Sequence, residues 1–104
     1  MELKYQPIQT LYNGLLFRSR LEARWAVFFD ALAISYQYEP EGYQLPSGWY
    51  LPDFYLPTQK YWIEIKGEAP TDQEEELLHQ LGKLTNKDGF IFWGGFPHLN
   101  EINC

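Results

Sequence analysis

The segment from Tyr50 to Lys66, YLPDFYLPTQKYWIEIK, is the part of the chain that most restricts its fold. Two runs rich in aromatic and β-branched residues, Tyr50 to Leu56 and Tyr61 to Lys66, flank the turn-like residues Pro57 to Lys60. Apolar runs separated by a short turn of this kind are typical of a β-hairpin. The sequence therefore predicts two antiparallel strands in the middle of the chain.

The register of this hairpin places two carboxylates side by side. A turn centred on Thr58 and Gln59 sets Asp53 opposite Glu64, with Leu56 opposite Tyr61 and Tyr55 opposite Trp62. Side chains alternate between the faces of a strand, so Asp53, Glu64 and Lys66 share one face. The other face carries Phe54, Leu56, Ile63 and Ile65. Because like charges directly opposite each other destabilise a strand pair, we expect a divalent cation between the two carboxylates.

The length of the chain favours one domain, residues 1–104, with a core from about residue 18 to residue 93. Hydrophobic residues make up 45% of the chain and aromatic residues 18%, which indicates a globular fold. Neither a membrane-spanning apolar run nor the layout of a signal peptide is evident, so a cytoplasmic protein is expected. Cys104, the single cysteine, excludes an internal disulfide framework.

The net charge of −6 argues against broad, non-specific binding of a polyanion. The three arginines nevertheless fall within one short stretch, at Arg18, Arg20 and Arg24. Such a cluster predicts either a local contact with a nucleic-acid backbone or a solvated start of a helix. Both interpretations are compatible with an acidic protein.

Two helices are predicted on either side of the hairpin. The first spans Ser19 to Ala33, where apolar residues recur at helical spacing, namely Leu21, Trp25, Phe28, Phe29 and Leu32. Ser19 and Glu22 form an S-x-x-E capping-box pattern, and Glu22 flanks the apolar stripe. The second helix begins after Thr71, which forms the same pattern with Glu74, and its apolar stripe consists of Leu77, Leu78, Leu81 and Leu84.

Short strands complete the predicted architecture. Ile34 to Tyr38 alternates like a strand, and Tyr43 to Leu45 either continues it or begins a loop. The run Phe90 to Trp93 is continuously apolar and predicts a strand buried on both faces, parallel to Tyr61 to Lys66. The segment from Met1 to Phe17 is expected to be irregular or a short extended arm. The element order is αβββαβ, which favours an α/β fold with helices packed on a mixed sheet.

The carboxylates and the lysine suggest metal-dependent phosphodiester hydrolysis. Mg²⁺ is usually held by one or two carboxylates, waters and substrate phosphate oxygens, which suits Asp53 and Glu64, with Glu22 as a third carboxylate from the helix. Lys66 is expected to hold the attacking water or to offset charge that develops on the phosphate. The arginine cluster would then hold the DNA or RNA backbone.

These residues resemble the PD-(D/E)XK nuclease superfamily, whose fold is restriction-endonuclease-like. The resemblance extends from about Arg18 to Trp93 and rests on RSRLEARWA in the first helix and YLPDF with WIEIKG in the hairpin, as in similar small phage-encoded proteins. It implies Mg²⁺ or Mn²⁺ held by Asp53, Glu64 and Glu22, with the Ile65 carbonyl as an extra ligand and Lys66 supporting the attacking water. The RecB-like Q-x-x-x-Y pattern does not follow, because Leu84 stands four residues after Gln80.

The main hypothesis is therefore a metal-dependent endonuclease that acts on DNA in the host cytoplasm, working as a homodimer because one small domain buries little substrate. A second hypothesis is a repurposed, inactive protein of the same fold that binds or inhibits a host protein. Hydrolysis of a nucleotide or another small phosphate is a third. Glu39 and Glu41 are expected in an exposed bend, and His79 and His98 on the surface.

Overall fold

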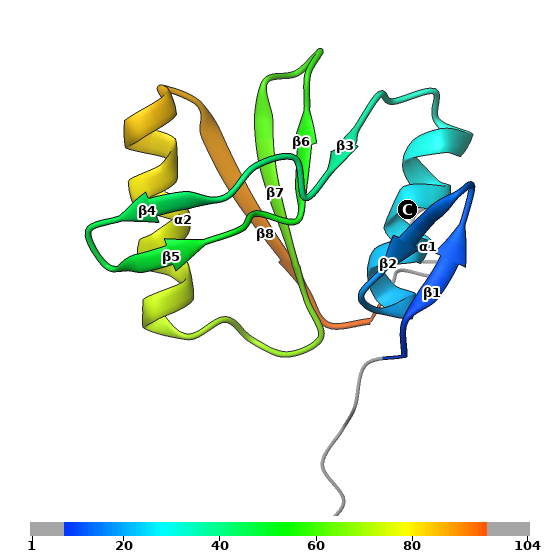
Figure 1. Ribbon diagram of the computed structural model, residues 1–104, viewed down its shortest axis with the longest axis horizontal. Helices are drawn as coiled ribbons and strands as arrows, with labels where there is room; N and C mark the ends of the chain where they lie inside the picture. The colour runs from blue at the N-terminus through cyan, green and yellow to red at the C-terminus, as the bar shows by residue number, and fades with distance from the viewer. Residues whose placement is uncertain (1–7, 96–104) are drawn as a thin grey trace, which may run out of the picture.

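The computed structural model describes residues 8–95, which form a mixed four-stranded sheet, two helices and two small hairpins (Figure 1). In chain order the elements are β1 (Thr10–Tyr12), β2 (Leu15–Phe17), α1 (Arg20–Ala31), β3 (Gln37–Tyr38), β4 (Tyr43–Leu45), β5 (Gly48–Tyr50), β6 (Phe54–Leu56), β7 (Tyr61–Lys66), α2 (Asp72–Thr85) and β8 (Asp88–Trp93). The sheet order is β3-β6-β7-β8, with only β7 and β8 parallel. The α/β class with helices packed on a mixed sheet is thus confirmed.

The central β6–β7 hairpin has the predicted register. Phe54 pairs with Ile63, Tyr55 with Trp62 and Leu56 with Tyr61. The first strand is shorter than predicted, because β6 begins at Phe54 and Tyr50 belongs to β5 instead. Pro52, which is fully buried, interrupts the run, since proline has no N–H to donate to a strand ladder. The interruption leaves Asp53 just outside the strand, on an irregular segment that leads into it.

The two faces of β7 are buried under different helices. Ile63 and Ile65 pack with Phe54 and with Phe29 of α1, whereas Trp62 packs with Leu78 and Leu81 of α2. The helices therefore cover opposite faces of the sheet (Figure 1). This alternation matches the predicted division of the hairpin into two faces. It also places Glu64, between Ile63 and Ile65, on the α2 side.

The buried face of α1 differs from the predicted stripe. Ala23, Ala26 and Phe29 are buried with Glu22, while Leu32 is exposed. Ala23 and Ala26 belong to the same core cluster as Phe54, Ile63 and Ile65 of the sheet. Trp25 lies at the side of this contact and stacks on Phe92 of β8, with ring centres 5.0 Å apart. The predicted stripe is thus confirmed at Leu21, Trp25, Phe28 and Phe29, which are buried or pack against the core, and was wrong at Leu32; it also omitted the buried alanines.

The apolar run at Phe90 to Trp93 is an edge strand, and the prediction that both of its faces are buried was wrong. Among residues 8–95, β8 pairs with β7 alone, and Phe90, Phe92 and Trp93 are each exposed to solvent. The parallel pairing with β7 was predicted correctly. A continuous apolar run shows that a strand is present, but it does not show whether a further element covers that strand.

Two short hairpins lie outside the main sheet. β1 and β2 turn at Asn13 and Gly14, both with positive φ, so this part of the predicted arm is a hairpin. β4 and β5 pair across Pro46 and Ser47, which resolves the ambiguity at Tyr43 to Leu45 in favour of a separate hairpin. The predicted strand at Ile34 to Tyr38 is reduced to β3. Neither of the two helices described is long and apolar enough to cross a membrane.

Candidate functional site

A cavity of about 420 Å³ opens on the α2 side of the sheet, beside the start of β6 and the end of β7. Its charged lining residues are Arg18, Glu39, Asp53, Glu64, Lys66 and Glu74. They come from the segment before α1, the bend after β3, the hairpin β6–β7 and the start of α2. Segments distant in sequence therefore bring both signs of charge to one cavity.

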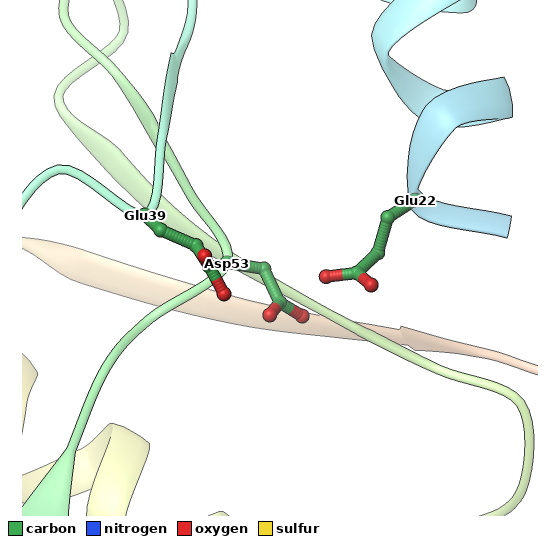
Figure 2. A group of neighbouring side chains, drawn as sticks. All are labelled: Glu22, Glu39 and Asp53. Carbon is green, nitrogen blue, oxygen red and sulfur yellow. The ribbon is translucent and has the colours of Figure 1, made fainter. Parts of the chain in front are cut away.

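Three carboxylates converge at this site. Glu22, Glu39 and Asp53 each offer an oxygen atom, and these oxygen atoms lie within 4.8 Å of one another (Figure 2). Glu22 projects from α1, Glu39 from the bend after β3, and Asp53 from the segment before β6 (Figure 2). Glu22 and Asp53 are only 7% and 8% exposed, so their charges are largely withdrawn from water. The group offers carboxylate oxygen atoms of the kind that hard cations bind.

The carboxylate of Glu22 is held by two hydroxyl groups. Ser19 Oγ donates to Glu22 Oε1 at 2.8 Å and Tyr38 Oη donates to Oε2 at 3.1 Å. Ser19 also caps α1, since its hydroxyl accepts a hydrogen bond from the Glu22 amide. The predicted cap is present, but the Glu22 side chain bonds the Ser19 hydroxyl and points toward Asp53.

Backbone contacts across β3, β6 and β7 position the other two carboxylates. The Ile65 amide donates to Asp53 Oδ2 at 2.7 Å. The Glu39 amide donates to the Asp53 carbonyl at 2.8 Å, which continues the pairing of Tyr38 with Phe54. Arg18 Nε lies 2.6 Å from Glu39 Oε2. Asp53 is thereby tied to both neighbouring strands of the sheet.

Glu64 lies beside this group with its own set of partners. Tyr50 Oη donates to Glu64 Oε1 at 2.6 Å, and the Asp53 amide approaches the same oxygen at 3.4 Å. Lys66 Nζ lies 3.1 Å from Glu64 Oε2 and 2.8 Å from Glu74 Oε2. Glu64 therefore links the acidic group to Lys66, and Glu74 holds the lysine from the opposite side.

The acidic surroundings change the protonation of Asp53. Burial, and then the negative charges of Glu64 and Glu22, raise the pKa of Asp53 to about 9. Burial also raises the pKa of Glu39, against the opposing effect of the Arg18 guanidinium. These effects favour the protonated form of Asp53 in the metal-free protein. A bound cation would supply the positive charge that lets it ionise.

The environment of Lys66 has the opposite effect. Burial alone would lower the pKa of the ammonium group, but the hydrogen bonds and charges of Glu74 and Glu64 outweigh it and raise that pKa. Lys66 is thus a permanent cation at neutral pH and cannot serve as a general base. Both roles expected from the sequence, holding the attacking water and offsetting negative charge, use this ammonium group and stay predictions.

Of the predicted site residues, five lie close together in the structure: Glu22, Asp53, Glu64, Lys66 and Arg18. Arg20 and Arg24 lie outside this group. Arg24 lines a neighbouring hollow that shares only Lys66 and Glu74 with the cavity, and Arg20 is exposed. The Ile65 amide donates a hydrogen bond to Asp53. That the Ile65 carbonyl binds a metal stays a prediction. His79 is exposed on α2, as expected, and His98 lies outside the described residues.

Glu39 is the site residue that sequence reasoning assigned to an exposed bend. It is only partly exposed and lies in the acidic group. The pairing of β3 with β6 puts Glu39 next to Asp53, so the missing information was the register between these two strands. No protein-family model, curated protein or solved structure matches this chain.

Proposed function

We propose that this protein is a metal-dependent endonuclease that hydrolyses phosphodiester bonds in DNA. The observation that carries the proposal is the convergence of Glu22, Glu39 and Asp53 within 4.8 Å, next to Glu64 and Lys66. Arg18 compensates the charge of Glu39, but the two buried carboxylates of Glu22 and Asp53 repel each other, and a bound cation would relieve that repulsion. A function that needs the cation accounts for carboxylates that would otherwise only destabilise the fold.

The donor set favours Mg²⁺ or Mn²⁺. Every candidate ligand side chain is a carboxylate, and hard oxygen ligands suit these ions rather than zinc or copper. Glu22, Glu39 and Asp53 would hold the metal, with Glu64 and the Ile65 carbonyl as the further ligands that the resemblance implies. When bound, the metal would supply an activated water and polarise a phosphoryl oxygen.

The remaining charged residues have separate tasks in this proposal. Lys66, held by Glu64 and Glu74, offsets the negative charge that develops on the scissile phosphate. Arg18 lines the same cavity and forms an ion pair with Glu39. In this proposal its guanidinium also binds a DNA phosphate next to the scissile one, which weakens the ion pair with Glu39. Tyr50 keeps Glu64 in place through its short hydrogen bond.

The order of elements supports membership of the PD-(D/E)XK superfamily. α1, β3, β6, β7, α2 and β8 follow the αβββαβ order of the restriction-endonuclease-like core, with β1–β2 and β4–β5 as additions. Asp53, Glu64 and Lys66 occupy the P-D and E-x-K positions of the central hairpin. DNA as the substrate, the dimer and the host cytoplasm as the location all follow from this proposal and the resemblance.

Cleavage and metal binding test the proposal together. The purified protein is incubated with plasmid, branched DNA and single-stranded DNA in Mg²⁺ and in Mn²⁺, and its melting temperature is recorded with and without each ion. We expect cleavage that disappears in Asp53→Asn and persists in Asp88→Asn, which removes an exposed carboxylate at the start of β8. Cleavage that survives in Asp53→Asn would refute the proposal, as would inactivity on all three substrates.

A repurposed protein that binds a host protein is the second candidate. The observation in its favour is the β1–β2 hairpin, where Leu11 and Leu16 are largely exposed. Exposed apolar residues in a cluster often mark a protein interface. A stoichiometric partner recovered from host lysate and lost in Leu11→Asp, combined with a melting temperature that metal does not change, would favour this candidate over the nuclease.

A further inference from the structure

Trp49 is an exposed aromatic residue that lines the acidic cavity. It lies in β5, beside Tyr50 and Leu51 in the lining of the 420 Å³ cavity, and it is 65% exposed. Its neighbour Tyr50 points inward and donates to Glu64. Because successive strand residues point to opposite sides, the same short strand serves the acidic group with one residue and presents an indole with the next.

The indole of Trp49 is held in place although it is exposed. A Cβ atom at Gly42 would lie 2.1 Å from Trp49 Cζ2, so the ring packs directly against the backbone of Gly42. The hairpin that carries the ring is itself anchored to α2. Ser47 in its turn exchanges hydrogen bonds of 2.7 to 3.0 Å with Gln73 and Gln80. An anchored, exposed indole needs little ordering when a ligand binds it.

A flat ring at the entrance to a phosphodiesterase site suits a nucleobase. Stacking of a base on an aromatic side chain is strong and tolerant of sequence, but it needs a free face of the base. In a duplex both faces are covered by neighbouring base pairs, whereas an unpaired base can turn toward the ring. The net charge of −6 likewise disfavours a long duplex held mainly by phosphate contacts.

We propose that Trp49 stacks on an unpaired nucleobase of the strand whose phosphate enters the acidic cavity, so that the protein selects single-stranded or branched nucleic acid. This inference rests on the proposed nuclease function and specifies its substrate class. The cavity volume lies in the lower part of the range for small-ligand sites, consistent with one nucleotide. Trp49 is a binding and specificity residue, and the metal chemistry does not require it.

Binding in Ca²⁺ tests the stacking contact without depending on turnover. The probes are fluorescently labelled oligothymidylate and a blunt DNA duplex, and the variants are Trp49→Ala, Trp49→Phe and Trp93→Ala. Loss of one stacked base weakens binding by about 5- to 150-fold, so this range is expected for Trp49→Ala on oligothymidylate. Trp49→Phe retains most of the affinity, and Trp93→Ala, which removes an exposed indole outside this cavity, retains all of it.

The variant Gly42→Ala provides an independent check, because it displaces the ring without removing it. The new methyl group would overlap the indole, so we expect Gly42→Ala to weaken oligothymidylate binding in the same direction as Trp49→Ala. Equal losses on oligothymidylate and duplex, or unchanged binding in Trp49→Ala, would overturn the inference. Mn²⁺ is also expected to raise the melting temperature in a way that depends on Asp53. If the stacking test fails but this rise is observed, the proposed nuclease function is retained. If Mn²⁺ does not raise the melting temperature, the proposed function itself is refuted.

Discussion

The two helices begin with the same sequence pattern, yet their glutamates are used differently. At α2, Thr71 Oγ1 accepts from the Glu74 amide, and Glu74 Oε1 accepts from the Thr71 amide at 2.9 Å, a complete capping box. At α1, Ser19 caps the helix in the same way, but the Glu22 carboxylate takes the Ser19 hydroxyl instead. Glu74 is half-buried and Glu22 is buried.

The difference shows that one local pattern can fulfil two roles. A capping box satisfies backbone N–H groups at a helix start and stabilises the helix wherever it occurs. Glu22 gives up half of that box and is buried with Asp53, next to the partly exposed Glu39, and crowding of carboxylates costs stability. Glu74 completes its box and uses its second oxygen for Lys66. We therefore expect metal binding to depend on Glu22 and stability to depend on Glu74.

The largest difference between the two glutamates is expected in metal affinity, measured in the variants Glu22→Gln and Glu74→Gln. Removing the Glu22 charge from the ligand group is expected to weaken Mn²⁺ binding by about a hundredfold or more, and cleavage with it. Glu74→Gln leaves Mn²⁺ affinity within about threefold, because Glu74 contacts the lysine and not the ligand group. Isothermal titration calorimetry measures both. Equal losses in the two variants would show that the helix starts are not functionally distinct.

The acidic group also predicts how stability depends on pH. In the metal-free fold the pKa of Asp53 is raised from 3.8 to about 9, so the folded state holds a proton that the unfolded state has lost. The free energy of unfolding should therefore fall as pH rises from about 4 toward about 9. Urea unfolding in chelator measures it, with Asp53→Asn as the control that removes this slope. At neutral pH, Mn²⁺ should release a proton on binding.

How much of this was visible in the sequence depends on the range of each interaction. The β6–β7 register and the Thr71 cap were predicted correctly, because both are encoded by residues close together in the chain. Glu39 was missed, since its place beside Asp53 depends on the pairing of β3 with β6 across an inserted hairpin. The exposure of β8 was missed for the same reason. It depends on the absence of a strand beyond β8 in the described sheet.

In the absence of metal, the two glutamine substitutions should change stability in opposite directions. Glu22→Gln removes one of several crowded negative charges and is expected to stabilise the metal-free fold by about 1 kcal/mol. Glu74→Gln weakens the helix dipole interaction and the contact with Lys66, and is expected to destabilise it by about 1 kcal/mol. Denaturant midpoints in chelator test this. If Glu22→Gln destabilises the metal-free protein, Glu22 is a structural residue like Glu74.

The smallest effects are expected from the capping hydroxyls. Ser19→Ala and Thr71→Ala each remove a side chain that caps a helix, so both should cost about 0.5 to 1 kcal/mol of unfolding free energy. Only Ser19→Ala also frees the Glu22 carboxylate from one of its two hydroxyl partners. It should therefore weaken Mn²⁺ binding severalfold, with Thr71→Ala as the matched control that does not. An equal effect of both on Mn²⁺ affinity would mean that helix stability alone controls the site, and Ser19 would then have no part in positioning Glu22.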